Sequence, residues 1–311
     1  MDRATCALGV DVGGTRVSAA LVDAAGRCLE LQRRPTPRLD GAEATLALIA
    51  EMLDVILAAT ALRPVGIGIG FGGPVDHGAR RIRRSHHAPG WADVDPGAIL
   101  GPRFGLPVWL ENDANAAGLG ELLFGAAKGA AACLYVNIGT GVGGAVLVNG
   151  AIHHGAHCNA GEFGHMVLDP TGPDCPCGKR GCVEALCSGD AIGRMARQRW
   201  GDRPGEPPAG KDVGALAASG DPWALAIVGE AAEHMGRALA IACNLLDPEI
   251  VVLGGGVSEI GEAYMRPVRE AFGRYAMPVP AESTRVVGAS LGYDAGVVGA
   301  AAVALLSAIE S

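Results

Sequence analysis

Residues 133–148 read CLYVNIGTGVGGAVLV, an apolar run followed by a glycine-rich turn and a second apolar run. Gly139–Gly144 matches the G-x-G-x-x-G spacing of dinucleotide-binding turns, and Glu162 follows at about the distance of a ribose contact. Such a turn must open a helix, whereas Ala145–Val148 has strand character and ends at the hairpin pair Asn149-Gly150. The stretch therefore predicts a β-hairpin. Its turn is either an ordinary tight turn or a cradle whose backbone N–H groups bind phosphate.

The start of the chain carries a similar pattern. Ala7–Val12 and Val17–Val22 are strand-like and flank Gly13-Gly14-Thr15. Between and after the two hairpins, strand-like and helical stretches alternate, which predicts an α/β fold built in layers. The predicted helices are Ala42–Ala61, Asn112–Phe124, Asp221–Leu246 and a small-residue helix from Asp294, and the other predicted strands are Val65–Phe71, Pro107–Leu110 and Ile250–Leu253.

Composition limits the classes of protein that fit. The chain has 311 residues with 48 glycines, is 49% hydrophobic and 19% charged, and carries a net charge of -8. These values exclude a disordered chain, a collagen and a coiled coil, and the length suggests two domains. The acidic charge and the scarcity of aromatic residues predict no nucleic-acid partner.

The N-terminus and the cysteines indicate a compartment. Asp2 and Arg3 do not begin a secretory signal, so the nine cysteines are expected to stay reduced in the cytoplasm. Gly129–Gly161 lacks acidic and basic residues, but polar residues such as Asn137 and a glycine cluster interrupt it, so no membrane partner is expected.

A cysteine-rich segment predicts a metal site. Residues 174–182 read DCPCGKRGC and place Cys175, Cys177 and Cys182 within eight residues, with His165 ten residues before Cys175. Three thiolates and one imidazole form a closed tetrahedral zinc site of the structural type. Buried free cysteines, the alternative, do not explain such spacing in a loop rich in glycine and proline.

Asp113 is the candidate catalytic carboxylate. It follows Glu111 and Asn112 at a predicted strand-to-helix junction. An aspartate there can cap the helix for purely structural reasons. The same position suits a general base, because a helix N-terminus keeps a carboxylate ionised while it accepts a proton from substrate. The segment alone leaves both interpretations open.

Taken together, these segments resemble the ROK family of bacterial sugar kinases and sugar-responsive repressors, over nearly the whole chain. The motifs that carry the resemblance are DVGGT at 11–15, ENDANAA at 111–117, GTGVGG at 139–144, AGEFGH at 160–165 and CPCGKRGCVE at 175–184. The resemblance implies a two-domain actin-like ATPase (ribonuclease H-like) fold with an interdomain cleft and a zinc knuckle. It places residues 1–113 and 294–311 in a smaller lobe and residues 114–293 in a larger lobe that holds the zinc.

The resemblance also implies a reaction, the ATP-dependent phosphorylation of a hexose, glucose or a close relative, at the 6-hydroxyl. Asp113 would deprotonate that hydroxyl, and Asp11 would organise Mg²⁺ through water. Gly13, Gly14 and Thr15 would form one phosphate turn, Thr140 and Gly141 a second, and Gly254 and Gly255 would pass beneath the adenosine.

Sugar ligands carried over from the family are Asn112, Asp113, Glu162, His165 and Glu184. His165 would bind zinc through one ring nitrogen and the sugar through the other. Three positions depart from the family pattern: His87 stands where an asparagine usually contacts the sugar, and His157 and Cys158 stand where asparagine and glycine are usual. These departures prevent naming the sugar from the resemblance.

Alternative functions remain. The same family includes kinases of N-acetylmannosamine, N-acetylglucosamine and fructose, and non-enzymatic sugar-responsive regulators. The regulators carry a helix-turn-helix domain before the first phosphate turn, and no such element is expected before Asp11. A non-sugar actin-like ATPase gives no reason for the cysteine segment. We therefore expect a kinase whose partners are a hexose and ATP, assembled as a homodimer or homotetramer.

Overall fold

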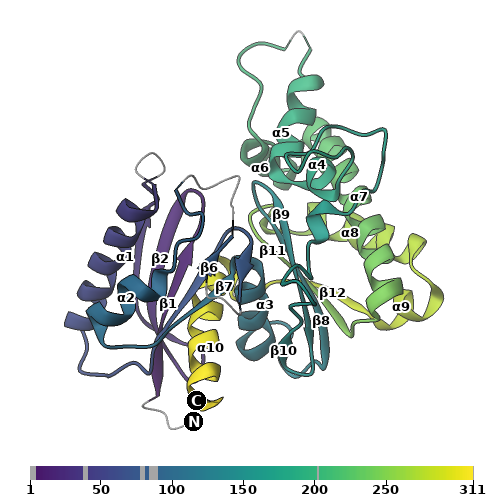
Figure 1. Ribbon diagram of the computed structural model, residues 1–311. Helices are drawn as coiled ribbons and strands as arrows, with labels where there is room; N and C mark the ends of the chain where they lie inside the picture. The colour runs from purple at the N-terminus through teal and green to yellow at the C-terminus, as the bar shows by residue number, and fades with distance from the viewer. Residues whose placement is uncertain (1–4, 38–40, 78–80, 84–89, 202, 311) are drawn as a thin grey trace. The chain divides into compact units, whose positions relative to one another are not determined.

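The computed structural model describes residues 5–37, 41–77, 81–83, 90–201 and 203–310 (Figure 1). The chain divides into two compact units. Unit 1 is Met1–Gly129 with Gly150–Ala160 and Tyr293–Ser311, and unit 2 is Ala130–Asn149 with Gly161–Gly292. Unit 1 thus continues beyond residue 113, where the sequence placed the boundary, because the helix that begins there packs against the C-terminal helix of the same unit.

Unit 1 is built on a five-stranded mixed sheet. Its strands are β1 (Cys6–Val12), β2 (Arg16–Asp23), β3 (Cys28–Pro35), β4 (Ile67–Phe71) and β7 (Val108–Asn112), in the order β3-β2-β1-β4-β7. The predicted hairpin is confirmed, since β1 and β2 are antiparallel, and β1, β4 and β7 run parallel. A small ribbon of β5 (Val75–Asp76) and β6 (Arg81–Ile82) lies outside this sheet.

Helices cover both faces of this sheet. They are α1 (Gly41–Ala58), α2 (Pro96–Phe104), α3 (Asp113–Phe124) and α10 (Ala295–Glu310), with α1 and α2 on one side and α3 and α10 on the other (Figure 1). The backbone of α10 lies against the strands: an added Cβ at Gly9 or Gly68 would come within 2.1 or 1.7 Å of an α10 carbonyl oxygen. Gly9 and Gly68 therefore permit close helix-to-sheet packing.

α10 also contributes the one helix among the described residues that is long and apolar enough to cross a membrane. Gly292–Ile309 is long and apolar enough to cross a membrane by length and composition, but 56% of it is buried inside the protein. Because α10 packs on β1, β4 and α3, its apolar character is that of a core helix.

Unit 2 repeats the sheet order. β8 (Ala132–Ile138), β9 (Val142–Val148), β10 (Ala151–Ile152), β11 (Ile250–Gly254) and β12 (Arg285–Gly288) are arranged as β10-β9-β8-β11-β12. β8 and β9 are antiparallel, which confirms that the glycine run at 139–144 joins two strands and opens no helix. β8, β11 and β12 are parallel. The prediction of an α/β fold is confirmed in both units.

The helices of unit 2 surround its core. They are α4 (Val183–Cys187), α5 (Gly189–Gln198), α6 (Gly210–Ala218), α7 (Pro222–Leu246), α8 (Glu262–Tyr275) and α9 (Pro278–Ser283), with short 3₁₀ turns at Phe163–His165 and Ser258–Ile260. α7 begins where the sequence predicts, because the Asp221 side chain accepts a hydrogen bond from the Ala224 N–H. α7 packs against α8, and its buried face is mostly alanine, valine, leucine and isoleucine.

Candidate active site

In unit 1, acidic side chains gather where three parallel strands end. The register aligns Asp11 of β1 with Gly70 of β4, and Gly70 with Glu111 of β7. Asp113 follows β7 directly as the first residue of α3. Ligands of α/β proteins bind at the carboxyl ends of such strands, so this edge is a candidate site.

Asn112, rather than Asp113, caps α3. The Asn112 Oδ1 accepts hydrogen bonds from the Ala114 N–H at 2.9 Å and the Asn115 N–H at 3.1 Å. Its Nδ2 donates one hydrogen bond to the Gly73 carbonyl at 3.2 Å and has a second hydrogen for another acceptor. The structural role considered for Asp113 therefore belongs to its neighbour, although Asp113 Oδ1 also accepts from the Ala114 N–H.

Two glycines give room to the carboxylates of Asp113 and Asp11. A Cβ on Gly72 would lie 3.3 Å from Asp113 Oδ2, and one on Gly296 would lie 2.9 Å from Asp11 Oδ2. Burial and the negative charge of Asp113 raise the pKa of Asp11 to about 7, with Arg16 acting in the opposite direction. The two aspartates thus repel each other, an arrangement that a bound cation would stabilise.

Glu111 is the centre of a polar cluster that sequence reasoning missed. It is 2% exposed, and its Oε1 accepts from the Asn112 N–H and the Asn115 Nδ2, both at 2.9 Å. Its Oε2 lies 2.7 Å from His154 Nε2 and 3.5 Å from His77 Nδ1. No local spacing links residues 77, 111 and 154, so only the fold reveals the cluster.

Protonation of the cluster follows from these contacts. Burial tends to raise the pKa of Glu111, but hydrogen bonds from His154, Asn115 and the Asn112 N–H outweigh it, and the pKa lies below its ordinary value. The hydrogen bond to Glu111 raises the pKa of His154, against the effect of burial. The Glu111 carboxylate and the His154 imidazole therefore favour an ion pair.

The two glycine-threonine turns lie at the ends of β1 and β8. In the first, the Gly13 N–H donates to the Arg16 carbonyl at 3.0 Å, and Thr15 is exposed. In the second, the Gly139 N–H donates to the Gly141 carbonyl at 2.9 Å, and Thr140 is exposed. Each turn is closed by its own backbone and presents its threonine to solvent.

Gly254 and Gly255 have a packing role of their own. Gly255 has φ +83°, and a Cβ there would lie 2.5 Å from the Ile138 carbonyl oxygen. A Cβ on Gly254 would lie 2.4 Å from the hydroxyl of Tyr135. Both glycines therefore let the end of β11 approach β8, whatever binds above them.

The four expected metal ligands of unit 2 converge. His165 Nδ1 lies 3.7 Å from Cys175 Sγ, Cys177 Sγ lies 3.7 Å from Cys182 Sγ, and all four ligand atoms lie within 4.8 Å of one another. In a tetrahedral site with Zn–S bonds of about 2.3 Å, sulfur ligands lie about 3.8 Å apart. The donor set and its spacing thus fit a tetrahedral metal ion.

The knuckle requires glycine at one bend. Gly181 has φ +62°, and a Cβ there would lie 1.5 Å from the Asp169 carbonyl oxygen. The Leu168 N–H donates to the Gly181 carbonyl at 2.8 Å, and the Val183 N–H donates to the Met166 carbonyl at 3.0 Å. These bonds join the cysteine loop to the segment that follows His165.

The remaining sugar-ligand candidates of unit 2 lie beside the knuckle. Glu162 is exposed, and its Oε2 lies 3.9 Å from His165 Nε2, the ring nitrogen that faces away from the cysteines. Glu184 lies in the first turn of α4, and its Oε2 accepts a hydrogen bond from the Val142 N–H at 2.9 Å. Its Oε1 lies 3.9 Å from Cys175 Sγ. Glu184 therefore connects the knuckle to the start of β9.

The structure describes two of the three positions that depart from the family pattern. His87 lies outside the described residues. His157 is exposed, and Cys158 has φ +54°, the left-handed conformation that favours glycine. Cys158 thus has a backbone conformation that glycine adopts more readily.

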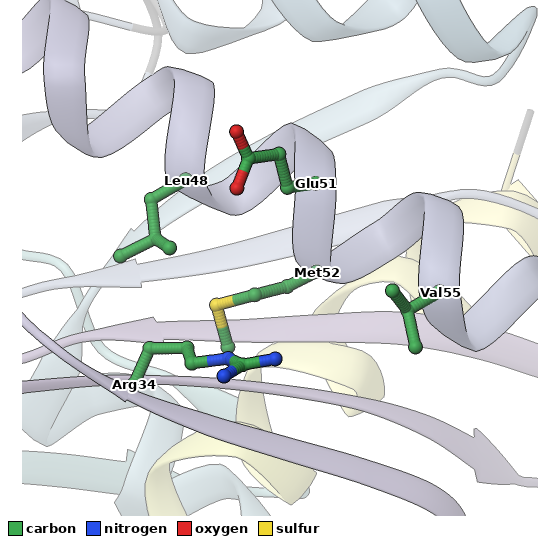
Figure 2. Close-up of a pocket in the computed structure, with 5 residues that line it drawn as sticks. All are labelled: Arg34, Leu48, Glu51, Met52 and Val55. Atoms are coloured by element: carbon green, nitrogen blue, oxygen red, sulfur yellow. The ribbon is translucent and has the colours of Figure 1, made fainter.

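A separate hollow of about 250 Å³ lies between β3 and α1. Figure 2 shows its lining, Arg34 from β3 with Leu48, Glu51, Met52 and Val55 from α1. None of these five residues is an expected ligand of ATP, sugar or metal, so this hollow is not the candidate active site.

Comparisons with known proteins find related chains of nearly full length. A family model described as ROK family matches residues 7–306. A glucokinase of Halalkalibacterium halodurans is 37% identical over 308 residues, which cover 94% of this chain and 92% of the relative. A ROK hexokinase from Thermus thermophilus is 37% identical with a TM-score of 0.85, covering 98% of this chain and 100% of that structure. A ROK family glucokinase from Streptomyces griseus, solved with glucose and AMPPNP, is 34% identical with a TM-score of 0.87, covering 97% and 99%. The chain belongs to the ROK family.

Proposed function

We propose that this chain transfers the γ-phosphoryl group of ATP to the 6-hydroxyl of glucose or a close relative, with Asp113 as the general base. Family membership and 37% identity to a glucokinase make it an ATP-dependent hexose kinase. The observation that carries the catalytic assignment is the position of Asp113, which leaves the carboxyl end of β7 with Gly72 beside its carboxylate. Glycine at position 72 leaves space beside Asp113 Oδ2, where a substrate hydroxyl can be placed.

The chemistry of this step depends on positioning and charge. Asp113 takes the proton from the hydroxyl as the oxygen attacks the γ-phosphorus, and the bond from the γ-phosphorus to the β,γ-bridging oxygen breaks to leave ADP. Bound Mg²⁺ supplies neutralisation of phosphate charge. Asp11 would hold that ion through water. Burial and the negative charge of Asp113 raise the pKa of Asp11 to about 7, and a bound cation would favour its ionised form.

Backbone groups hold the nucleotide in this proposal. The turn of Gly13, Gly14 and Thr15 in unit 1 and the turn of Thr140 and Gly141 in unit 2 bind phosphate through the threonine hydroxyls and the adjoining backbone, while the Gly13 N–H keeps its bond to the Arg16 carbonyl. The exposure of Thr15 and Thr140 supports the assignment. Gly254 and Gly255 lie beneath the adenosine, where a side chain would also collide with β8.

Sugar recognition is assigned to Asn112, Glu162, His165 and Glu184, with His87 a further candidate. The metal of the knuckle is zinc in this proposal, because three thiolates and an imidazole are zinc's usual structural ligands. Zinc at His165 Nδ1 would fix the ring and its tautomer, so that Nε2 donates to a sugar hydroxyl. The ion then acts on substrate binding and not on phosphoryl transfer.

A coupled assay of ADP formation tests the proposal. The zinc-loaded protein is assayed with Mg·ATP and glucose, mannose, fructose, allose, N-acetylmannosamine and N-acetylglucosamine, and glucose or a close relative is expected to give the highest kcat/KM. No ADP formation with any of these sugars would contradict the kinase assignment. If a hexose nevertheless raised the Tm without ADP forming, a non-enzymatic sugar-responsive regulator would be the better description.

Self-association and location complete the proposal. A homodimer or homotetramer is supported by exposed apolar side chains of α7 and its neighbour α9, among which Leu245 is 83% exposed. Light scattering should show an oligomer that Leu245→Glu weakens. Nine free cysteines, three of them in the metal knuckle, support an enzyme of the reducing cytoplasm.

A further inference from the structure

Three side chains of unit 1 that the proposed reaction does not use converge on a single oxygen atom. Glu111 Oε2 lies 2.7 Å from His154 Nε2 and 3.5 Å from His77 Nδ1. The three potential ligand atoms all lie within 4.8 Å of one another. Two neutral imidazoles and one carboxylate form the donor set of many open zinc sites.

Glu111 is held in the orientation that a ligand needs. Its Oε1 accepts from the Asn112 N–H and from Asn115 Nδ2, so that oxygen is fixed by neighbours of the same strand and helix. Oε2 is left to face the two histidines. Metal-ligating carboxylates are oriented by hydrogen bonds of this kind to the oxygen that does not bind. Because Glu111 is 2% exposed, its carboxylate cannot turn away to solvent.

The two rings are arranged for a shared partner. His77 and His154 are stacked, with centroids 4.3 Å apart and planes at 21°, and each directs one nitrogen at Glu111 Oε2. With metal–ligand bonds of about 2.0–2.1 Å, ligand atoms of a tetrahedral site lie about 3.3 Å apart. The 3.5 Å pair already fits. The 2.7 Å pair is a hydrogen bond that must lengthen by about 0.6 Å.

We propose that His77, Glu111 and His154 form a second binding site for Zn²⁺ or a similar divalent ion such as Co²⁺, separate from the cysteine knuckle. The ion replaces the proton shared by Glu111 and His154. The side chain of His77 is 43% exposed, so the site is open to solvent on that side and water completes the coordination. The bound ion links three segments of unit 1 immediately beside Asn112 and Asp113.

Metal titration tests this site independently of the kinase reaction. Untagged protein that carries one equivalent of zinc in the knuckle is titrated with Co²⁺ in chelator-free buffer, followed by calorimetry and visible absorption. The wild type should bind one further equivalent. Its spectrum should show d–d bands of a nitrogen and oxygen site without the thiolate-to-cobalt charge transfer that a cysteine site produces.

Variants assign the additional ion to these residues. His77→Ala and His154→Ala should each weaken the second binding event by about tenfold or more. His153→Ala is the matched control, because His153 is exposed and adjoins His154 but does not belong to the cluster, and it should bind as the wild type does. His77 is exposed, so its variant tests the site even if His154→Ala lowers stability.

The proposal fails on any of three results. The wild type could bind no second equivalent, which would leave the cluster as a simple ion pair between His154 and Glu111. The second equivalent could persist in both His77→Ala and His154→Ala. Or the second equivalent of Co²⁺ could show thiolate charge transfer, which would place it at cysteines.

Discussion

The two units have the same sheet order but different residues at the ends of their parallel strands. In unit 1, Asp11 and Glu111 are the last residues but one of β1 and β7, and Asp113 follows β7 directly. In unit 2, β11 and β12 end with the glycines Gly254 and Gly288. The polar groups of unit 2 come instead from the knuckle and its flanks. Under the proposed function, this difference means that unit 1 would supply charge and proton transfer, while unit 2 would supply backbone groups and a recognition group fixed by metal.

If this division holds, a carboxylate of unit 1 should control turnover. Asp113→Asn is expected to lower kcat by about 10²–10⁴-fold with little change in the Tm, because Asn112 continues to cap α3. Steady-state kinetics with the preferred hexose measures this. Asp190→Asn is the control, since Asp190 also lies in the first turn of a helix and is exposed. A kcat for Asp113→Asn within threefold of wild type would remove the general base from unit 1.

The knuckle of unit 2 should affect binding and stability instead. Cys182→Ser removes a fully buried ligand, so we expect loss of the metal, a lower Tm and a hexose KM raised by about tenfold, with kcat changed much less. Metal analysis, thermal unfolding and kinetics on one preparation separate these effects. Cys28→Ser, outside the knuckle, should match the wild type. If Cys182→Ser lowered kcat and left the hexose KM unchanged, the assignment of substrate binding to the knuckle of unit 2 would be wrong.

Asp11 should make metal-free unit 1 sensitive to pH. Its pKa is about 7 in the folded protein and near 4 when unfolded, so the folded state binds the proton more tightly. The stability that protonated Asp11 contributes is lost as pH rises from about 4 to 7. Without Mg²⁺, the Tm of the wild type relative to Asp11→Asn should therefore fall between pH 5 and pH 8. If the difference in Tm between the wild type and Asp11→Asn did not change with pH, the pKa of Asp11 would not be raised in the folded protein. The activity of Asp11→Asn separately tests the role of Asp11 with Mg·ATP.

The smallest expected effect concerns backbone alone. Cys158→Gly should stabilise the protein by about 1 kcal/mol, because Cys158 has φ +54° and glycine adopts that conformation without cost. Urea unfolding measures it. Ala156→Gly, in the same exposed loop but without a positive φ, should give no gain. If Cys158→Gly also changed the hexose KM, position 158 would matter to the sugar as well as to the backbone.

Sequence patterns predicted the elements with strong local signals. The hairpins β1–β2 and β8–β9, the long helix α7 and strand β11 were confirmed within a few residues. β3 was missed because it is an edge strand of sequence CLELQRRP, whose charged residues hide the alternation of a strand. α2 was missed although Asp95 and Pro96 give it the same start signal as Asp221 and Pro222 give α7. α2 has 9 residues and α7 has 25, so the helical periodicity of α2 is much weaker in the sequence.

The same contrast applies to the site. The knuckle could be predicted because three of its four ligands lie within eight residues, where chain spacing itself fixes geometry. The cluster of His77, Glu111 and His154 depends on the pairing of β7 and on a segment that returns to unit 1 after β9. No sequence window contains it. Likewise, the sequence suggested an aspartate cap for α3, and only the backbone shows that Asn112 has that position.

The close approach of α10 to Gly9 and Gly68 has a consequence for biosynthesis. These glycines accept the α10 backbone itself, so α10 covers this part of the faces of β1 and β4. The ribosome makes α10 after every residue of unit 2. The first strands to leave the ribosome must therefore wait for nearly the whole chain before unit 1 can close, while unit 2 can complete its sheet earlier. A fragment that ends at Gly129 should expose the α10-binding face and depend on chaperones.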